Sequence, residues 1–331
     1  MMCCYYPTTT VVIDDDKNFL KALIENLNAP DYRAYTSPKP AIESTRKYNN
    51  MQRICNRVIK ANSDANISSP EDKTITFKLR ALHEEIYNGT RFDDVSVIIV
   101  DYYMDEMNGI EVCEALAKHP AKKILLTGGA DMEALAIGAF NKGIIHYFIS
   151  KSDPLFPSKI KQAIASLKHA YFRDLTAALI PHLPSMPLQL HQFSPYINFT
   201  QSLRKQLNIV EHYIVDATGS TLMLDADGNK SWLIVKHESE MQDMEILAQD
   251  QDAPEDLIQG IKERTLIPFF LSDKDFNHPA SEWRRFFHPG QPLTCAKDYY
   301  YAIYSGDQEH QANQLTILSY NSYHQIMDFA K

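Results

Sequence analysis

The sequence predicts two domains of different class: an α/β domain built on a doubly wound parallel sheet of five strands, and a C-terminal α+β domain. A chain of 331 residues is too long for one ordinary core, since domains usually hold roughly 100 to 200 residues. In the first half, unbroken apolar runs alternate with stretches of helical spacing, as in βαβ crossovers. In the second half, short alternating runs are joined by turns, which is typical of antiparallel strands.

The elements of the first domain follow from these periodicities. "VSVIIV" (95–100) has no polar alternation, so this strand is expected to be covered on both faces of the sheet. The predicted strands are 8–13, 32–36, 95–100, 122–127 and 144–150. The predicted helices are 18–27, a helix from about Pro40, 109–119, 131–143 and a long helix over 160–179.

Residues 50–91 exceed what one crossover requires and predict a helical insertion. Ser69-Pro70-Glu71-Asp72 resembles an N-cap with a first helical turn, and Asn88-Gly89 would end the helix. Its apolar stripe is expected to pack against the domain, although it could also bind a partner; the stripe consists of Ile75, Leu79, Leu82 and Ile86.

Prolines divide the chain into a first domain at 8–178, a linker at 179–200 and a second domain at 201–331. They interrupt the helical pattern at Pro181, Pro184, Pro187 and Pro195. The long helix before them could transmit a change to the second domain or form a dimer seam. Core packing explains its first half equally well.

The second domain is predicted to be an antiparallel sheet with helices on one face. Three short strands lie within 212–238, with turns at Thr218-Gly219 and Asp227-Gly228. Asp225 and Asp227 could suggest a phosphatase or calcium site, but a hairpin turn explains them. Helices near 240–250 and 254–264 and β-like stretches at 298–304 and 314–320 complete this domain.

Charge and cysteine content restrict the partners and the compartment. From Leu175 onward there are 11 Lys and Arg against 20 Asp and Glu, so the net charge of -9 lies in the second half, which disfavours nucleic-acid binding. No membrane span or signal peptide is visible, and five cysteines without metal spacing indicate reduced thiols, so we expect a cytoplasmic protein. Cys3 and Cys4 are expected at a frayed terminus, with a redox pair as the alternative.

Polar side chains follow the predicted parallel strands where each strand ends. Asp14 and Asp15 follow the first strand, Asp101 the third, Thr127 the fourth and Lys151 the fifth. The carboxyl ends of parallel strands share one edge of the sheet, so these side chains should meet there. Close carboxylates repel one another unless a cation offsets their charge, and Mg²⁺ prefers such oxygen ligands. The expected chemistry is phosphoryl transfer to Asp101, with Thr127 and Lys151 contacting the phosphoryl group.

"VVIDDD", "VIIVDYYMDEMNGIEVCEAL", "KILLTGG" and "HYFISK" resemble, in order, the signatures of the CheY-like receiver domain of two-component response regulators. The resemblance implies a flavodoxin-like fold and a sensor histidine kinase or phosphotransfer protein as donor. It also implies that the backbone carbonyl of Tyr103 is a further Mg²⁺ ligand and that Phe148 is a switch residue beside Thr127. The alternative is a vestigial pocket that is never phosphorylated.

Four positions depart from the receiver pattern. Asp105 and Ser152 stand where prolines are usual, so Lys151 is expected in a loop with a trans peptide bond. Gly128 and Gly129 follow Thr127 with almost no side chain, which leaves the site open to water. We therefore expect a labile phosphoryl group.

The sequence leaves three functions open for the second domain. The chain as a whole is similar to the Lqs-type quorum-sensing response regulators, whose output domain resembles a diguanylate cyclase without the catalytic motif. No helix-turn-helix, GGDEF or hydrolase motif is visible, so a protein-interaction module that changes homodimerisation is favoured. The only activities expected are phosphoryl transfer to the protein itself and autodephosphorylation. Direct DNA binding and nucleotide handling are the alternatives. The Trp283–Phe287 cluster is expected to be a core edge rather than a nucleic-acid platform.

Overall fold

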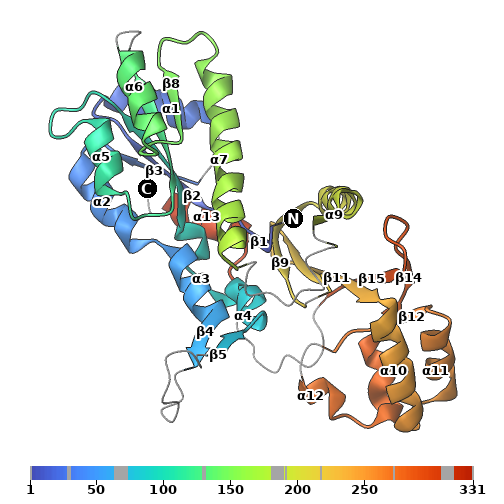
Figure 1. The fold of residues 1–331 in the computed structure, drawn as a ribbon. Helices are drawn as coiled ribbons and strands as arrows, with labels where there is room; N and C mark the ends of the chain where they lie inside the picture. The colour runs from blue at the N-terminus through green and yellow to red at the C-terminus, as the bar shows by residue number, and fades with distance from the viewer. Residues whose placement is uncertain are drawn as a thin grey trace.

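The computed structural model describes residues 2–27, 31–62, 74–128, 132–179, 190, 192–216, 218–270, 273–306 and 317–329. Figure 1 shows a parallel sheet with helices around it and, on the other side of the long helix α7, an antiparallel sheet. None of the helices in the described residues combines the length and the apolar character needed to cross a membrane.

The five predicted parallel strands are all present. They lie in the order β3-β2-β6-β7-β8, and every neighbouring pair is parallel. The doubly wound α/β fold is therefore confirmed, with the first strand near the middle of the sheet. The strands are β2 (Thr9–Ile13), β3 (Tyr32–Tyr35), β6 (Val95–Asp101), β7 (Lys122–Thr127) and β8 (Tyr147–Ser150).

Helices cover both faces of this sheet because successive strand residues point to opposite sides. Ile98 and Val100 contact the cluster formed with α2, α5 and α6, whereas Val97 and Ile99 contact the cluster formed with α1 and α7. All seven residues of β6 are buried, as its unbroken apolar run predicts. The helices are α1 (Lys17–Leu27), α2 (Pro38–Lys47), α5 (Gly109–Ala115), α6 (Glu133–Asn141) and α7 (Phe156–Leu179).

The insertion is partly helical, but it also contains a β-hairpin that was not predicted. Ile75 lies in β5 rather than in the expected helical stripe, and Ser69–Asp72 fall outside the described residues. Alternating threonines in "TITF" favour a strand over a helix. Leu82 and Ile86 are buried, as predicted. The elements are α3 (Asn50–Val58), β4 (Ile59–Asn62), β5 (Thr74–Phe77), α4 (Arg80–His83), η2 (Glu84–Tyr87) and η3 (Arg91–Asp93).

The second sheet is antiparallel, with six strands in the order β1-β9-β10-β11-β15-β14. Helix α9 (Ser194–Gln206) packs on one face, and α10 (Glu238–Asp250) and α11 (Glu255–Lys262) pack on the other. The prediction of helices on one face only was therefore wrong. Helix α9 begins inside the stretch expected as a linker. The strands are β1 (Cys4–Tyr5), β9 (Ile209–Ile214), β10 (Thr221–Asp225), β11 (Lys230–His237), β14 (Gln291–Pro292) and β15 (Tyr299–Ser305).

A smaller subdomain follows α11 along the chain. Strands β12 (Leu266–Pro268) and β13 (Phe287–Pro289) pair with each other, and α12 (Asp273–Phe276) and η6 (Ala280–Phe286) lie between them in the sequence. Trp283 and Phe286 are buried in the core of the second sheet, so the aromatic and basic cluster is a core edge, as predicted.

The N-terminal strand β1 joins the antiparallel sheet, and the C-terminal helix α13 (Tyr320–Phe329) packs beside the parallel sheet. These two findings correct two predictions. The N-terminus is not frayed: Cys3 and Cys4 are buried, and Cys4 pairs with Tyr213 of β9. At the other end, Tyr320 begins helix α13, where the β-like stretch 314–320 was expected to be a strand. The first positions of that stretch, 314–316, fall outside the described residues.

Helix α13 packs beside the parallel sheet (Figure 1). The Phe92 ring contacts the rings of Tyr320 and Tyr323, with centroids 5.5 and 5.2 Å apart. The Tyr320 hydroxyl donates to Asp31 over 2.6 Å, and the Tyr323 hydroxyl donates to Asp93 over 2.9 Å. These contacts fix the C-terminal helix to the parallel half of the molecule.

One hydrophobic core joins the antiparallel sheet to helix α7 and the insertion. It contains Ile54 and Leu82 of the insertion, Tyr171 and Phe172 of α7, and Trp232 of the antiparallel sheet. This core is continuous, so the second sheet is held against α7 and the insertion.

Candidate functional site

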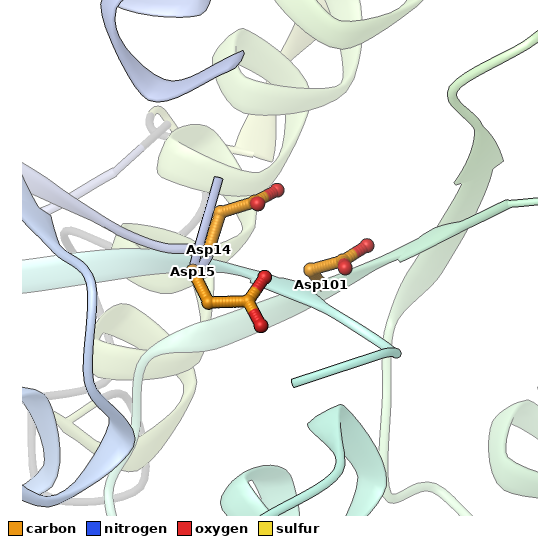
Figure 2. Close-up of side chains that lie close together, drawn as sticks. All are labelled: Asp14, Asp15 and Asp101. Atoms are coloured by element: carbon orange, nitrogen blue, oxygen red, sulfur yellow. The ribbon is translucent and has the colours of Figure 1, made fainter. Parts of the chain in front are cut away.

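Three carboxylates meet at the carboxyl edge of the parallel sheet. Asp14 and Asp15 follow β2, and Asp101 ends the neighbouring strand β6, in which Val100 pairs with Ile13. One oxygen from each of the three lies within 4.8 Å of the others, and Figure 2 shows the three side chains together. Among the described residues, these three carboxylates are the Asp, Glu, His or Cys side chains that lie close enough together to hold a metal ion.

The Lys151 ammonium links two of these carboxylates. Its Nζ atom lies 2.7 Å from Oδ2 of Asp14 and 2.8 Å from Oδ1 of Asp101. The Lys151 backbone amide donates to the Thr127 carbonyl over 2.8 Å, which fixes the start of the loop after β8. The strand ends therefore bring Asp14, Asp15, Asp101 and Lys151 together, as the sequence predicts.

Burial determines the electrostatics of the site. It raises the pKa of the Asp14 and Asp101 carboxyl groups above their ordinary value, although hydrogen bonding and attraction from Lys151 oppose the rise. Burial alone would lower the pKa of the Lys151 ammonium, but the two carboxylates outweigh it and raise this pKa. Among the described residues, Lys151 is the one cation paired with any of these three carboxylates, so negative charge exceeds positive charge at this edge.

The donor set fits a hard divalent cation. The Asp14 Oδ2 atom is buried, and its close partner is the Lys151 ammonium at 2.7 Å. Carboxylate oxygens are the ligands that Mg²⁺ prefers, and a divalent ion would offset the excess negative charge. Asp14, Asp15 and Asp101 could therefore hold Mg²⁺.

The N-terminus of helix α5 lies against Asp101 and positions it. The sequence analysis did not predict this contact. A Cβ atom on Gly109 would lie 2.4 Å from the Asp101 carbonyl oxygen, so only glycine lets α5 approach this closely. Asn108 and Glu111 form a reciprocal capping box at the same helix start. The spacing of Asn108, Gly109 and Glu111 is the sequence signal that could have located it.

Thr127, Tyr103 and Phe148 occupy different surroundings. Thr127 ends β7 and is buried, and Phe148 in β8 is half-buried against the core beneath α5 and α6. The Tyr103 side chain is 54% exposed, and its hydroxyl lies 2.9 Å from the Met132 sulfur. A Cβ on Gly128 would be 3.8 Å from the Tyr103 ring, so this ring borders the side expected to be open. Gly129 falls outside the described residues.

The loop after Lys151 matches the expectation from its sequence. The bond between Lys151 and Ser152 is trans, and the hydroxyls of Ser150 and Ser152 lie 2.8 Å apart. An additional neighbour of Lys151 was not predicted: its Nζ lies 4.3 Å from the ring centroid of Phe19. The helical spacing of Phe19 indicates a core residue and offers no sign of this contact.

The second sheet contributes no comparable constellation among the described residues. The Asp225 carboxylate accepts hydrogen bonds from the backbone amides of Asp227 and Asn229 over 3.0 and 2.9 Å. The Asp227 carboxylate accepts from the Asn321 side chain over 2.7 Å. Both side chains thus stabilise the hairpin turn and its contact with α13, which confirms the hairpin interpretation.

Comparison with known proteins links this chain to response regulators. The structure of the Legionella pneumophila response regulator LqsR matches with a TM-score of 0.76 and 33% identity, over 98% of this chain and 95% of that chain. A response regulator receiver domain protein from Clostridium thermocellum has a TM-score of 0.32 and 15% identity, over 49% of this chain and 95% of that chain. The response regulator TrrA from Thermotoga maritima, in complex with Mg²⁺ and BeF, has a TM-score of 0.29 and 16% identity, over 48% of this chain and 98% of that chain. No protein-family model and no curated protein matches this chain.

Proposed function

The chain belongs to the response-regulator family represented by LqsR, and on this premise we propose that it is a signalling switch in which Asp101 accepts a phosphoryl group. The family supports phosphorylation-controlled signalling in general. We propose the residue that accepts the phosphoryl group, the protein that donates it, the metal ion that assists the transfer and the output that follows. The donor we propose is a sensor histidine kinase or a phosphotransfer protein, and the signal we propose is quorum sensing.

The observation that carries the proposal is the position of Lys151 between Asp14 and Asp101, at 2.7 and 2.8 Å. A carboxylate that is buried beside an ammonium and two further carboxylates is suited to phosphoryl transfer, which depends on positioning and charge neutralisation. A solvated surface carboxylate has neither advantage.

In the proposed step, an Asp101 carboxylate oxygen forms a bond to phosphorus while the bond from phosphorus to the donor's imidazole nitrogen breaks. Lys151 holds positive charge beside the phosphoryl oxygens, and the Thr127 hydroxyl donates a hydrogen bond to one of them. Asp14, Asp15, Asp101 and the Tyr103 carbonyl would hold Mg²⁺, which supplies charge neutralisation when bound. The aspartyl phosphate is then lost by hydrolysis.

For the output we propose homodimerisation and contact with a protein target that regulates gene expression indirectly. The shared core and the two terminal elements hold the second sheet against α7, so release of a free output domain would expose a large apolar surface. A conformational change at the surface of α6 and β8, near the site, does not require this apolar surface to be exposed. Large apolar side chains are exposed there: Leu135, Ile137, Phe140 and Tyr147.

Mass spectrometry after treatment with a small acyl phosphate and Mg²⁺ tests the acceptor. We expect one added phosphoryl group on the wild type and none on Asp101→Asn; equal labelling of both would overturn the assignment. Size-exclusion chromatography of the same samples tests the output, with a larger species expected only for phosphorylated wild type. Binding of DNA or a nucleotide by the acidic second domain would instead favour one of the alternative outputs.

A further inference from the structure

The Lys151 ammonium has three close neighbours. A lysine ammonium carries three N–H donors, and here the carboxylates of Asp14 and Asp101 are its ion-pair partners. The third neighbour is the Phe19 ring, whose centroid lies 4.3 Å from Nζ. At this distance the negative face of an aromatic ring attracts a cation.

The Phe19 ring is held by the first turns of two helices. Phe19 is the third residue of α1 and is half-buried, and its ring lies 5.9 Å from that of Phe156, the first residue of α7, at an interplanar angle of 54°. The Asp16 side chain accepts from the Phe19 backbone amide over 3.2 Å, which fixes the start of α1. The ring is therefore placed by the same sheet edge that places the carboxylates.

The hydrogen bond from the Lys151 amide to Thr127 fixes the Lys151 backbone, but it does not fix the ammonium at the end of the side chain. That side chain has four rotatable bonds, and the following residue is Ser152 rather than a conformationally restricted proline. The two carboxylates attract the ammonium, but attraction alone does not select one position between them.

We infer that Phe19 is a positioning residue for Lys151: its ring holds the ammonium over Asp101 and thereby sets the rate at which Asp101 is phosphorylated. This inference rests on the proposed function. The simpler interpretation is that Phe19 only fills space between α1 and α7, in which case any apolar side chain of similar size would serve.

The experiment compares Phe19→Leu, which keeps an apolar side chain, with Phe19→Trp, which keeps an aromatic face. Phosphorylation of Asp101 by a small acyl phosphate with Mg²⁺ is followed by mass spectrometry. We expect Phe19→Leu to be slower than wild type by about fivefold and Phe19→Trp to remain within about twofold. Phe172→Leu is the matched control, because Phe172 lies in the core between α7 and the antiparallel sheet and is not a Lys151 contact.

A wild-type rate for Phe19→Leu would overturn the inference, and so would a Phe19→Trp rate as low as that of Phe19→Leu. Circular dichroism and the unfolding temperature of each variant separate these results from misfolding. A second readout does not need phosphorylation: acylation of Lys151 by acetic anhydride should be faster in Phe19→Leu than in wild type or Phe172→Leu. If wild type is never phosphorylated, the proposed function fails, while this acylation rate still tests the contact.

Discussion

Arg91 and Glu211 form a fully buried, bidentate ion pair between the insertion and the antiparallel sheet. The Nε and Nη2 atoms of Arg91 donate to the two Glu211 carboxylate oxygens over 2.8 and 2.9 Å, and both side chains are 0% exposed. Arg91 also donates to the Leu318 carbonyl, and the Tyr213 hydroxyl donates to Glu211. Three separate segments of the chain therefore meet at one buried charge pair.

Breaking this pair should destabilise both halves of the molecule together. We expect Glu211→Ala to lower the free energy of unfolding by about 3 to 5 kcal/mol, because it leaves the Arg91 charge buried and unpaired. Denaturant unfolding followed by circular dichroism measures the change. Arg80→Ala, which removes an exposed pair with Glu84, should change stability by less than about 1 kcal/mol. Two separate unfolding transitions in the wild type would contradict the shared core.

The C-terminal helix should contribute to stability through its contacts with the parallel half. Tyr320→Phe removes a hydrogen bond to the carboxylate of Asp31, so we expect a loss of about 1.5 to 3 kcal/mol in the free energy of unfolding. Tyr147→Phe, at an exposed position in β8, is the matched control and should be nearly neutral. Equal stabilities of the two variants would argue against docking of α13.

Asp94 should make stability depend on pH. Burial raises the pKa of this carboxyl group to about 6, although it accepts hydrogen bonds from the Asn50 backbone and from the hydroxyls of Tyr171 and Tyr6. The stability that protonated Asp94 contributes is fully present below about pH 4, the pKa of an aspartate in the unfolded chain. It is lost as the pH rises through about 6, and the total loss is about 3 kcal/mol.

The comparison of wild type with Asp94→Asn isolates this group, because the histidines with lowered pKa values are the same in both proteins. His83 is one of them, and its pKa falls to about 4 through burial. The stability of wild type relative to Asp94→Asn should decline between pH 4 and pH 7, as measured by denaturant unfolding at each pH. A difference that stays constant over this range would show that Asp94 keeps an ordinary pKa.

Mg²⁺ affinity should depend on Asp15. Removing one of three carboxylates from the site should weaken Mg²⁺ binding by about tenfold in Asp15→Asn, as measured by isothermal titration calorimetry. Asp105→Asn changes an exposed carboxylate in the loop after β6 and serves as the control. If both variants bind as wild type does, the ion is held elsewhere.

The exposed face of α6 should be needed for the proposed dimer. Ile137 is 43% exposed, so Ile137→Glu should leave Asp101 phosphorylation intact while preventing the increase in size after phosphorylation. Light scattering coupled to size-exclusion chromatography measures the mass. Ile246→Glu, at a position in α10 that is 58% exposed, is the control and should still form the larger species. Loss of assembly in the control alone would move the interface to α10.

Local patterns were sufficient for the parallel half of the molecule. The apolar runs predicted all five strands, and the strand ends placed Asp14, Asp101 and Lys151 at one edge because the carboxyl ends of parallel strands share that edge. The insertion was harder, since Ile75 fits a helical stripe and a strand equally well by spacing alone. Phe19 was missed for a similar reason: a core aromatic and a neighbour of an ammonium have the same periodicity.

The sequence by itself determined which residues form the strands and helices of the parallel sheet and which charged groups gather at its edge, because both depend on short-range periodicity and on a rule of sheet geometry. Only the tertiary structure decided that β1 pairs with β9, that α13 docks beside β2 and β3, and that Arg91 meets Glu211. Each of these contacts joins segments that are far apart in the chain. Their free energy comes from burial and charge pairing that no local pattern records.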